Sequence, residues 1–186
     1  MPGVVIGVSD HGGWAILVTA GRDGRLLDRR RVELVDDSLP AIPHHHEGQM
    51  MPIDDAVALV ERVRASAVRH AMLALDAVAN DVANIEGIAL RVCPQLPPTV
   101  AERITDVWAR NNADWVMYRE ALASAAEARG WKVHWIEAKA VPAVAARALG
   151  VASFDTYFSE MRKSVGAPWN ADHKLALAAA IASARD

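Results

Sequence analysis

The sequence contains little of what marks a secreted, membrane-spanning or strongly basic protein. Cys93 is the single cysteine among 186 residues, so no intramolecular disulfide framework can form, which is typical of a reducing compartment. No apolar run reaches the roughly 18 residues of a membrane span. The N-terminus also lacks the charged and long apolar regions of a secretory signal. We therefore expect a cytoplasmic protein with no membrane partner.

An excess of positive charge is absent as well. The net charge is −3 and the isoelectric point is near 6.2, whereas non-specific nucleic-acid binding usually depends on basic patches. A role with nucleic acid would need a local basic surface. What the chain does have is 52% apolar and 23% charged residues, which supports a sizeable core and excludes global disorder. Its length predicts one domain over residues 1–186.

The first part of the chain predicts an antiparallel meander. Residues 3–9 form a continuous apolar run, as in a strand covered on both faces. Gly12 and Gly13 supply a hairpin turn before a second strand over 14–18. A further turn leads to a more polar third strand over 26–34.

Helices and strands alternate in the remainder. The patterns predict helices over 54–75, 100–129, 140–149 and from about 171 to the C-terminus, and the second of these is expected to bend near Asn111 and Asn112. They also predict strands over 85–93 and 131–138. The segment 151–171 is mixed and contains aromatic residues. A meander followed by alternation predicts an α/β (α+β) fold with a mixed five-stranded sheet and helices on both faces. Right-handed crossovers then give the strand order 3-2-1-4-5. This is the element order of the ribonuclease H-like fold.

Three stretches add a family resemblance. They are "IGVSDHGGWAILVTAGRDGRLLDRR" from residue 6, "YREALASAAEARGWKVHWIEAKAV" from residue 118 and "VGAPWNADHKLALAAAIA" from residue 165. In this order they resemble the first strands, the middle helix with the fifth strand, and the final helix of RuvC-like Holliday-junction resolvases, whose first strand reads approximately IGIDPG. The resemblance implies a ribonuclease H-like nuclease in which carboxylates hold two Mg²⁺ or Mn²⁺ ions that activate water for phosphodiester hydrolysis.

The resemblance also indicates site residues. Asp10 matches the acid of strand one, and Asp172 matches the acid of the final helix. The family's acid at the far end of strand four is replaced by Arg91, while Glu86 lies at the beginning of that strand. Glu47 precedes the first helix and could stand in for the missing acid. Two simpler interpretations stay open, because Asp before Gly-Gly suits a turn and Asp before a helix suits an N-cap.

The string "PHHHEG" suggests a second set of ligands near Asp10. In extended backbone alternate residues share a side, so His44 with His46, or His45 with Glu47, could bind one metal ion. Imidazole favours transition metals, whereas carboxylates favour Mg²⁺ or Mn²⁺. The alternative is a solvated surface loop.

Residues near the final helix complete the candidates. His173 could act as a general acid or base because a histidine pKa lies near neutrality, and Lys174 could contact phosphate. Both are also compatible with ordinary exposed helix positions. Trp14 and Trp169 lie near the two ends of the predicted site and are the tryptophans best placed to stack on bases.

Two functions follow from these observations. The first is a metal-dependent endonuclease acting on branched or single-stranded nucleic acid, with Asp10, Asp172 and either Glu47 or Glu86 holding metal. The alternative is a non-catalytic ribonuclease H-like domain used for binding or assembly, which Arg91 and the acidic isoelectric point favour. If the metal site exists, Mg²⁺ or Mn²⁺ should raise the melting temperature. A homodimer stays open.

Overall fold

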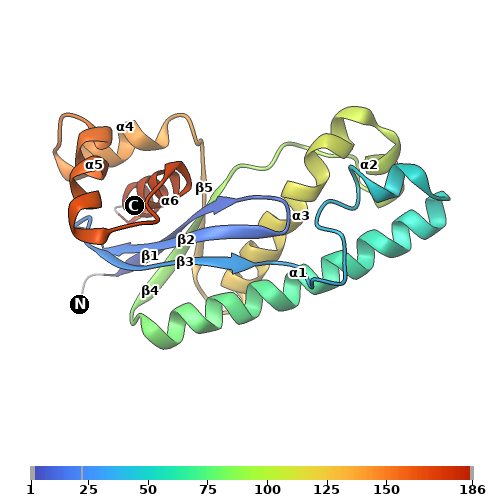
Figure 1. Ribbon diagram of the computed structural model, residues 1–186, viewed down its shortest axis with the longest axis horizontal. Helices are drawn as coiled ribbons and strands as arrows, with labels where there is room; N and C mark the ends of the chain where they lie inside the picture. The colour runs from blue at the N-terminus through green and yellow to red at the C-terminus, as the bar shows by residue number, and fades with distance from the viewer. Residues whose placement is uncertain (1–2, 22, 185–186) are drawn as a thin grey trace.

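The structure, a computed structural model, describes residues 3–21 and 23–184 (Figure 1). Its strands are β1 (Val4–Asp10), β2 (Trp14–Gly21), β3 (Leu26–Glu33), β4 (Ile85–Arg91) and β5 (Lys132–Ile136). Its helices are η1 (Glu47–Met50), α1 (Ile53–Asp81), α2 (Val100–Thr105), α3 (Val107–Glu127), α4 (Val141–Leu149), α5 (Phe154–Val165) and α6 (Ala171–Ser183). None of the helices in these described residues is both long and apolar enough to cross a membrane.

The five strands form one mixed sheet in the order β3-β2-β1-β4-β5, which confirms the predicted order. β2 pairs antiparallel with β1 and β3, whereas β4 pairs parallel with β1 and β5. Because β1 and β4 run in the same direction, their carboxyl ends meet at one edge of the sheet. Asp10 and Arg91, the last residues of these strands, are therefore neighbours.

Helices cover both faces of the sheet, α1 and α3 on one and α4, α5 and α6 on the other (Figure 1). Side chains alternate between the faces along a strand. In β1, Ile6 and Val8 belong to the core against α1 and α3, while Val5 belongs to the core against α6. By the same alternation Asp10 faces α3 and Ser9 faces α6.

Local sequence explains where the helices differ from the predicted ranges. The region expected as one helix over 100–129 is two helices, because Asp106 ends α2 and caps α3 by accepting a hydrogen bond from the Ala109 amide at 2.7 Å. The segment expected to be mixed contains α5, which Ser153 caps. Its aromatic side chains pack in pairs: the ring centroids of Phe154 and Tyr157 lie 6.0 Å apart, and Phe158 stacks on Trp169 at 4.5 Å.

Gly7 lets α6 pack directly on the backbone of β1. A Cβ atom at this position would lie 1.8 Å from the Ala176 carbonyl oxygen and 2.7 Å from the Ala180 amide nitrogen. Backbone atoms of a packed helix cannot rotate away, so we expect Gly7→Ala to lower the free energy of unfolding by about 3 kcal/mol. Urea denaturation of the two proteins measures the difference. An unchanged midpoint would contradict this close approach.

Candidate functional site

Asp10 ends β1 with a side chain that is fully buried between two arginines. Arg91 donates from Nε to Oδ1 at 3.0 Å and from Nη2 to the Asp10 carbonyl oxygen at 2.8 Å. Arg119, from α3, donates from Nε to Oδ2 at 2.8 Å and from Nη1 to the Val92 carbonyl oxygen. One carboxylate is thus shared by two guanidinium groups, which leaves the cluster with a net positive charge.

This arrangement does not fit Mg²⁺ or Mn²⁺. Such ions bind carboxylate oxygens, but both oxygens of Asp10 already accept hydrogen bonds from arginine. Two guanidinium groups this close would also repel a divalent cation. Within residues 3–21 and 23–184, moreover, no group of three or more His, Cys, Asp or Glu side chains is arranged to hold a metal ion.

Asp172 lies in the first turn of α6 and contacts the residues on either side of Asp10. Its Oδ1 atom accepts hydrogen bonds from Ser9 Oγ at 3.0 Å and His11 Nε2 at 2.7 Å. Strand alternation points those two side chains toward α6 and Asp10 toward α3. Asp10 and Asp172 therefore have different hydrogen-bond partners, and their sharing of one metal site stays a prediction. Aligning the resolvase pattern IGIDPG on Gly7 places its acid at Ser9.

The local environment keeps Asp172 ionised. Burial raises the pKa of its carboxyl group, but the hydrogen bonds from His11 and Ser9 lower it, and the result is a pKa below the ordinary value of 3.8. Both hydrogen bonds use Oδ1. Among the described residues no hydrogen bond to Oδ2 is formed, so this oxygen can accept one from a ligand.

His173 and Lys174 have structural partners. The Asn170 side-chain oxygen accepts hydrogen bonds from the amides of Asp172 and His173, and it lies 2.7 Å from His173 Nδ1, which forms a capping box. Burial, together with the charge of Arg29, lowers the pKa of His173, so this ring is neutral at physiological pH. Lys174 forms an ion pair with Asp155 of α5.

Three side chains form a stack next to Asp172: His11 from the turn after β1, Trp14 from β2 and Arg31 from β3. The rings of His11 and Trp14 are nearly parallel, with centroids 3.9 Å apart and 5° between their planes. The Arg31 guanidinium carbon also lies 3.9 Å from the Trp14 ring centroid. One face of the indole cannot hold both groups at that distance, so the order is His11, Trp14, Arg31. A hollow of about 270 Å³ lies beside this stack, between β2, β3 and the start of α6.

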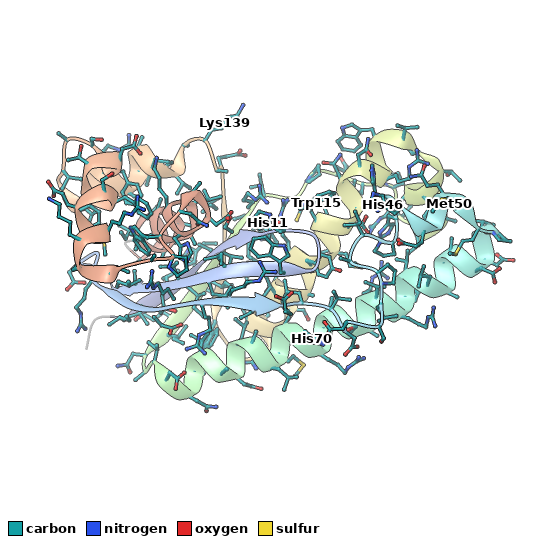
Figure 2. The ribbon with its side chains drawn as sticks, viewed as in Figure 1. His11, His46, Met50, His70, Trp115 and Lys139 are labelled. Carbon is teal, nitrogen blue, oxygen red and sulfur yellow. The ribbon has the colours of Figure 1, made fainter. Side chains whose placement is uncertain are left out.

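The histidine loop is held by α3. Asp114 accepts three hydrogen bonds from it: from His44 Nδ1 at 2.7 Å, from the His44 amide at 3.0 Å and from the His45 amide at 3.1 Å. Both the His44 and the Asp114 side chains are fully buried. Figure 2 places His46 and Met50 toward one end of the molecule and His11 near its centre.

Asp114 binds His44 and His45, and the predicted approach of His44, His45, His46 and Glu47 to Asp10 stays a prediction. Glu86 is far from Asp10. It lies at the start of β4 against Gly3, at the opposite end of β1. Gly3 and Asp10 are seven positions apart along extended backbone, a distance of about 23 Å.

The comparisons with known proteins concern the fold. No protein-family model and no curated protein sequence matches the chain. Among solved structures, T. thermophilus RuvC in complex with a Holliday junction substrate matches 97% of this chain and 91% of its own, with 15% identity and a TM-score of 0.50. This chain has a RuvC-like fold. A second structure, Thermus thermophilus RuvC, matches 96% of this chain and 92% of its own at 15% identity and a TM-score of 0.43.

The sequence gives little indication of some residues of this site. Arg119 gave no local signal, since it lies 109 positions from Asp10 and a single arginine on a helix is usually solvated. The sequence marks Arg91 only as a replacement for the family's acid at the end of strand four. The His11–Trp14 pair did carry a signal, because residues that flank a tight hairpin turn face each other across two strands.

Proposed function

We propose that this RuvC-like domain binds branched or single-stranded nucleic acid without cleaving it. The proposal rests on the partners of the Asp10 carboxylate. Both of its oxygens accept hydrogen bonds from Arg91 and Arg119, and the side chain faces away from Asp172. Metal-dependent hydrolysis needs carboxylates that hold ions around one phosphodiester. Here the two acids at the expected positions lie on opposite faces of the sheet.

The surface around Trp14 supports nucleic acid as the ligand. Arg31 is half-exposed and presents a cationic group over an aromatic ring, and single strands bind to surfaces that combine stacking and positive charge. This is a local basic feature on an acidic chain. The fold agrees, since the RuvC structure similar to this chain is in complex with a Holliday junction.

Binding and cleavage should be measured together on labelled four-way junctions and single strands, with Mg²⁺ or Mn²⁺ present. We expect binding that weakens as salt rises, because phosphate contacts release counterions, and no cleavage. Arg31→Ala should weaken binding about fivefold. The matched control is Arg64→Ala, which removes an exposed arginine from α1 on the opposite side of the sheet and should change nothing.

The alternative is the metal-dependent nuclease that the resemblance implies. Cleavage that requires Mn²⁺ or Mg²⁺ and is lost in Asp172→Asn would establish it and overturn the proposal. A rise in melting temperature with either ion, absent from the same variant, would point the same way. Failure to bind any of the nucleic acids would overturn both functions.

A further inference from the structure

We infer that the hollow beside Trp14 receives one unstacked nucleobase and selects bases that carry an exocyclic amino group. The inference rests on the proposed function and names the part of the nucleic acid that this site reads. The hollow measures about 270 Å³. This is below the roughly 300–1,000 Å³ of sites for larger ligands, so it suits a single base ring.

The walls of the hollow suit a flat ring. Trp14 and Arg31 line it from β2 and β3, and Pro168 and Asn170 line it from the segment that leads into α6. Bases that leave a helix or belong to a single strand stack on aromatic rings and on guanidinium planes. Since His11 and Arg31 cover the two faces of Trp14, the guanidinium plane of Arg31 is the stacking surface that remains.

Among the residues that line the hollow, which include Arg29, Arg31 and Asn170, Asp172 supplies the carboxylate. An ionised carboxylate accepts hydrogen bonds and donates none, so it repels phosphate and attracts an N–H group. Oδ2 is the free acceptor, as both contacts from Ser9 and His11 use Oδ1. Carboxylates read cytosine through its N4 amino group. Thymine offers only an N–H between two carbonyl oxygens, which a carboxylate disfavours.

The arginines nearby have distinct roles. Arg29 donates from Nη2 to the Val165 carbonyl oxygen at 2.9 Å and from Nη1 to the carbonyl oxygens of Gly166 and Pro168, so it holds the segment between α5 and α6 in place. Arg31 has one carboxylate partner, Glu33, at an exposed position. Arg31 is therefore the residue free to meet the phosphate next to an inserted base.

The test uses 11-residue oligothymidylates with one central dC, dA, dG or dT, whose binding is followed by fluorescence anisotropy. We expect the three strands with an amino base to bind about tenfold more tightly than the all-dT strand. Asp172→Asn should remove this preference. Asp76→Asn, which removes an exposed acid from α1 on the other face, should retain it.

A change in the base gives the same test without altering the protein. A central N4,N4-dimethylcytosine lacks both amino hydrogens and should bind no better than dT. Equal binding of all strands, or a preference that survives in Asp172→Asn or with the dimethylated base, would overturn the base pocket and leave the proposed function standing. Absence of binding to every strand would overturn the proposed function and the pocket with it.

Discussion

Replacing Asp10 with alanine should lower the free energy of unfolding by about 3–5 kcal/mol, because it removes one partner of a buried ionic cluster. The carboxylate is fully buried and Arg119 is only 9% exposed, so water cannot replace the lost hydrogen bonds. Arg91, which is 29% exposed, can turn toward solvent. Most of the loss should therefore come from the Arg119 guanidinium.

The attribution to Arg119 can be checked with a double variant measured by urea denaturation. Adding Arg119→Met to Asp10→Ala removes the uncompensated charge and should restore part of the lost stability. The matched control is Asp76→Ala, because the Asp76 side chain is 60% exposed and an ion pair at the surface contributes about 0–1 kcal/mol. An Asp10→Ala protein as stable as this control would show that the cluster does not stabilise the fold.

Replacing Asp114 with alanine should also have a large effect. Its buried carboxylate accepts three hydrogen bonds from the histidine loop, and the change leaves two backbone amides and an imidazole nitrogen without an acceptor. Each buried unsatisfied group costs about 1–3 kcal/mol, so a total loss of about 3 kcal/mol is expected. Hydrogen exchange should show faster exchange at the His44 and His45 amides.

Tyr118→Phe is the matched control for the loop. Its hydroxyl donates to the Ala41 carbonyl oxygen at 2.7 Å, and burial, aided by the charge of Asp114, raises the pKa of Tyr118, so the hydroxyl stays a donor. Its loss removes one hydrogen bond, worth about 1 kcal/mol, and should leave exchange at His44 and His45 slow. Slow exchange in the Asp114 variant as well would mean that other contacts hold the loop.

The sheet could be predicted from the sequence because its determinants are local. A glycine-rich turn between two apolar runs specifies a hairpin, and the handedness of crossovers limits where the later strands go. The site depended on finer information. Its position at the end of a strand favours Asp10 as a metal ligand. The face of the sheet toward which its side chain points depends on the alternation of side chains along the strand, so a shift of one residue reverses it.

Other parts of the site depend on contacts between distant residues. Asp114 binds His44, which lies 70 positions away in the sequence. A single aspartate inside a helix gives no indication of such a partner. Three adjacent histidines suggest a metal site because imidazole is a metal ligand. The sequence does not show that His44 is buried against a carboxylate. The resemblance identified the fold correctly, but the fold alone does not determine the roles of individual side chains, because folds persist when side chains change.

The close contact of Gly7 with α6 also sets the position of Asp172. From Gly7 to Ser9 the strand advances by two residues, about 6.6 Å, and from Ala176 back to Asp172 the helix advances by four residues, about 6 Å. The two lengths nearly match, so the approach at Gly7 brings Asp172 level with Ser9 one helical turn away. A residue inserted into α6 between these points would turn Asp172 by about 100° around the helix axis. The absence of a side chain at Gly7 thus determines how closely Asp172 approaches the sheet and in which direction it points.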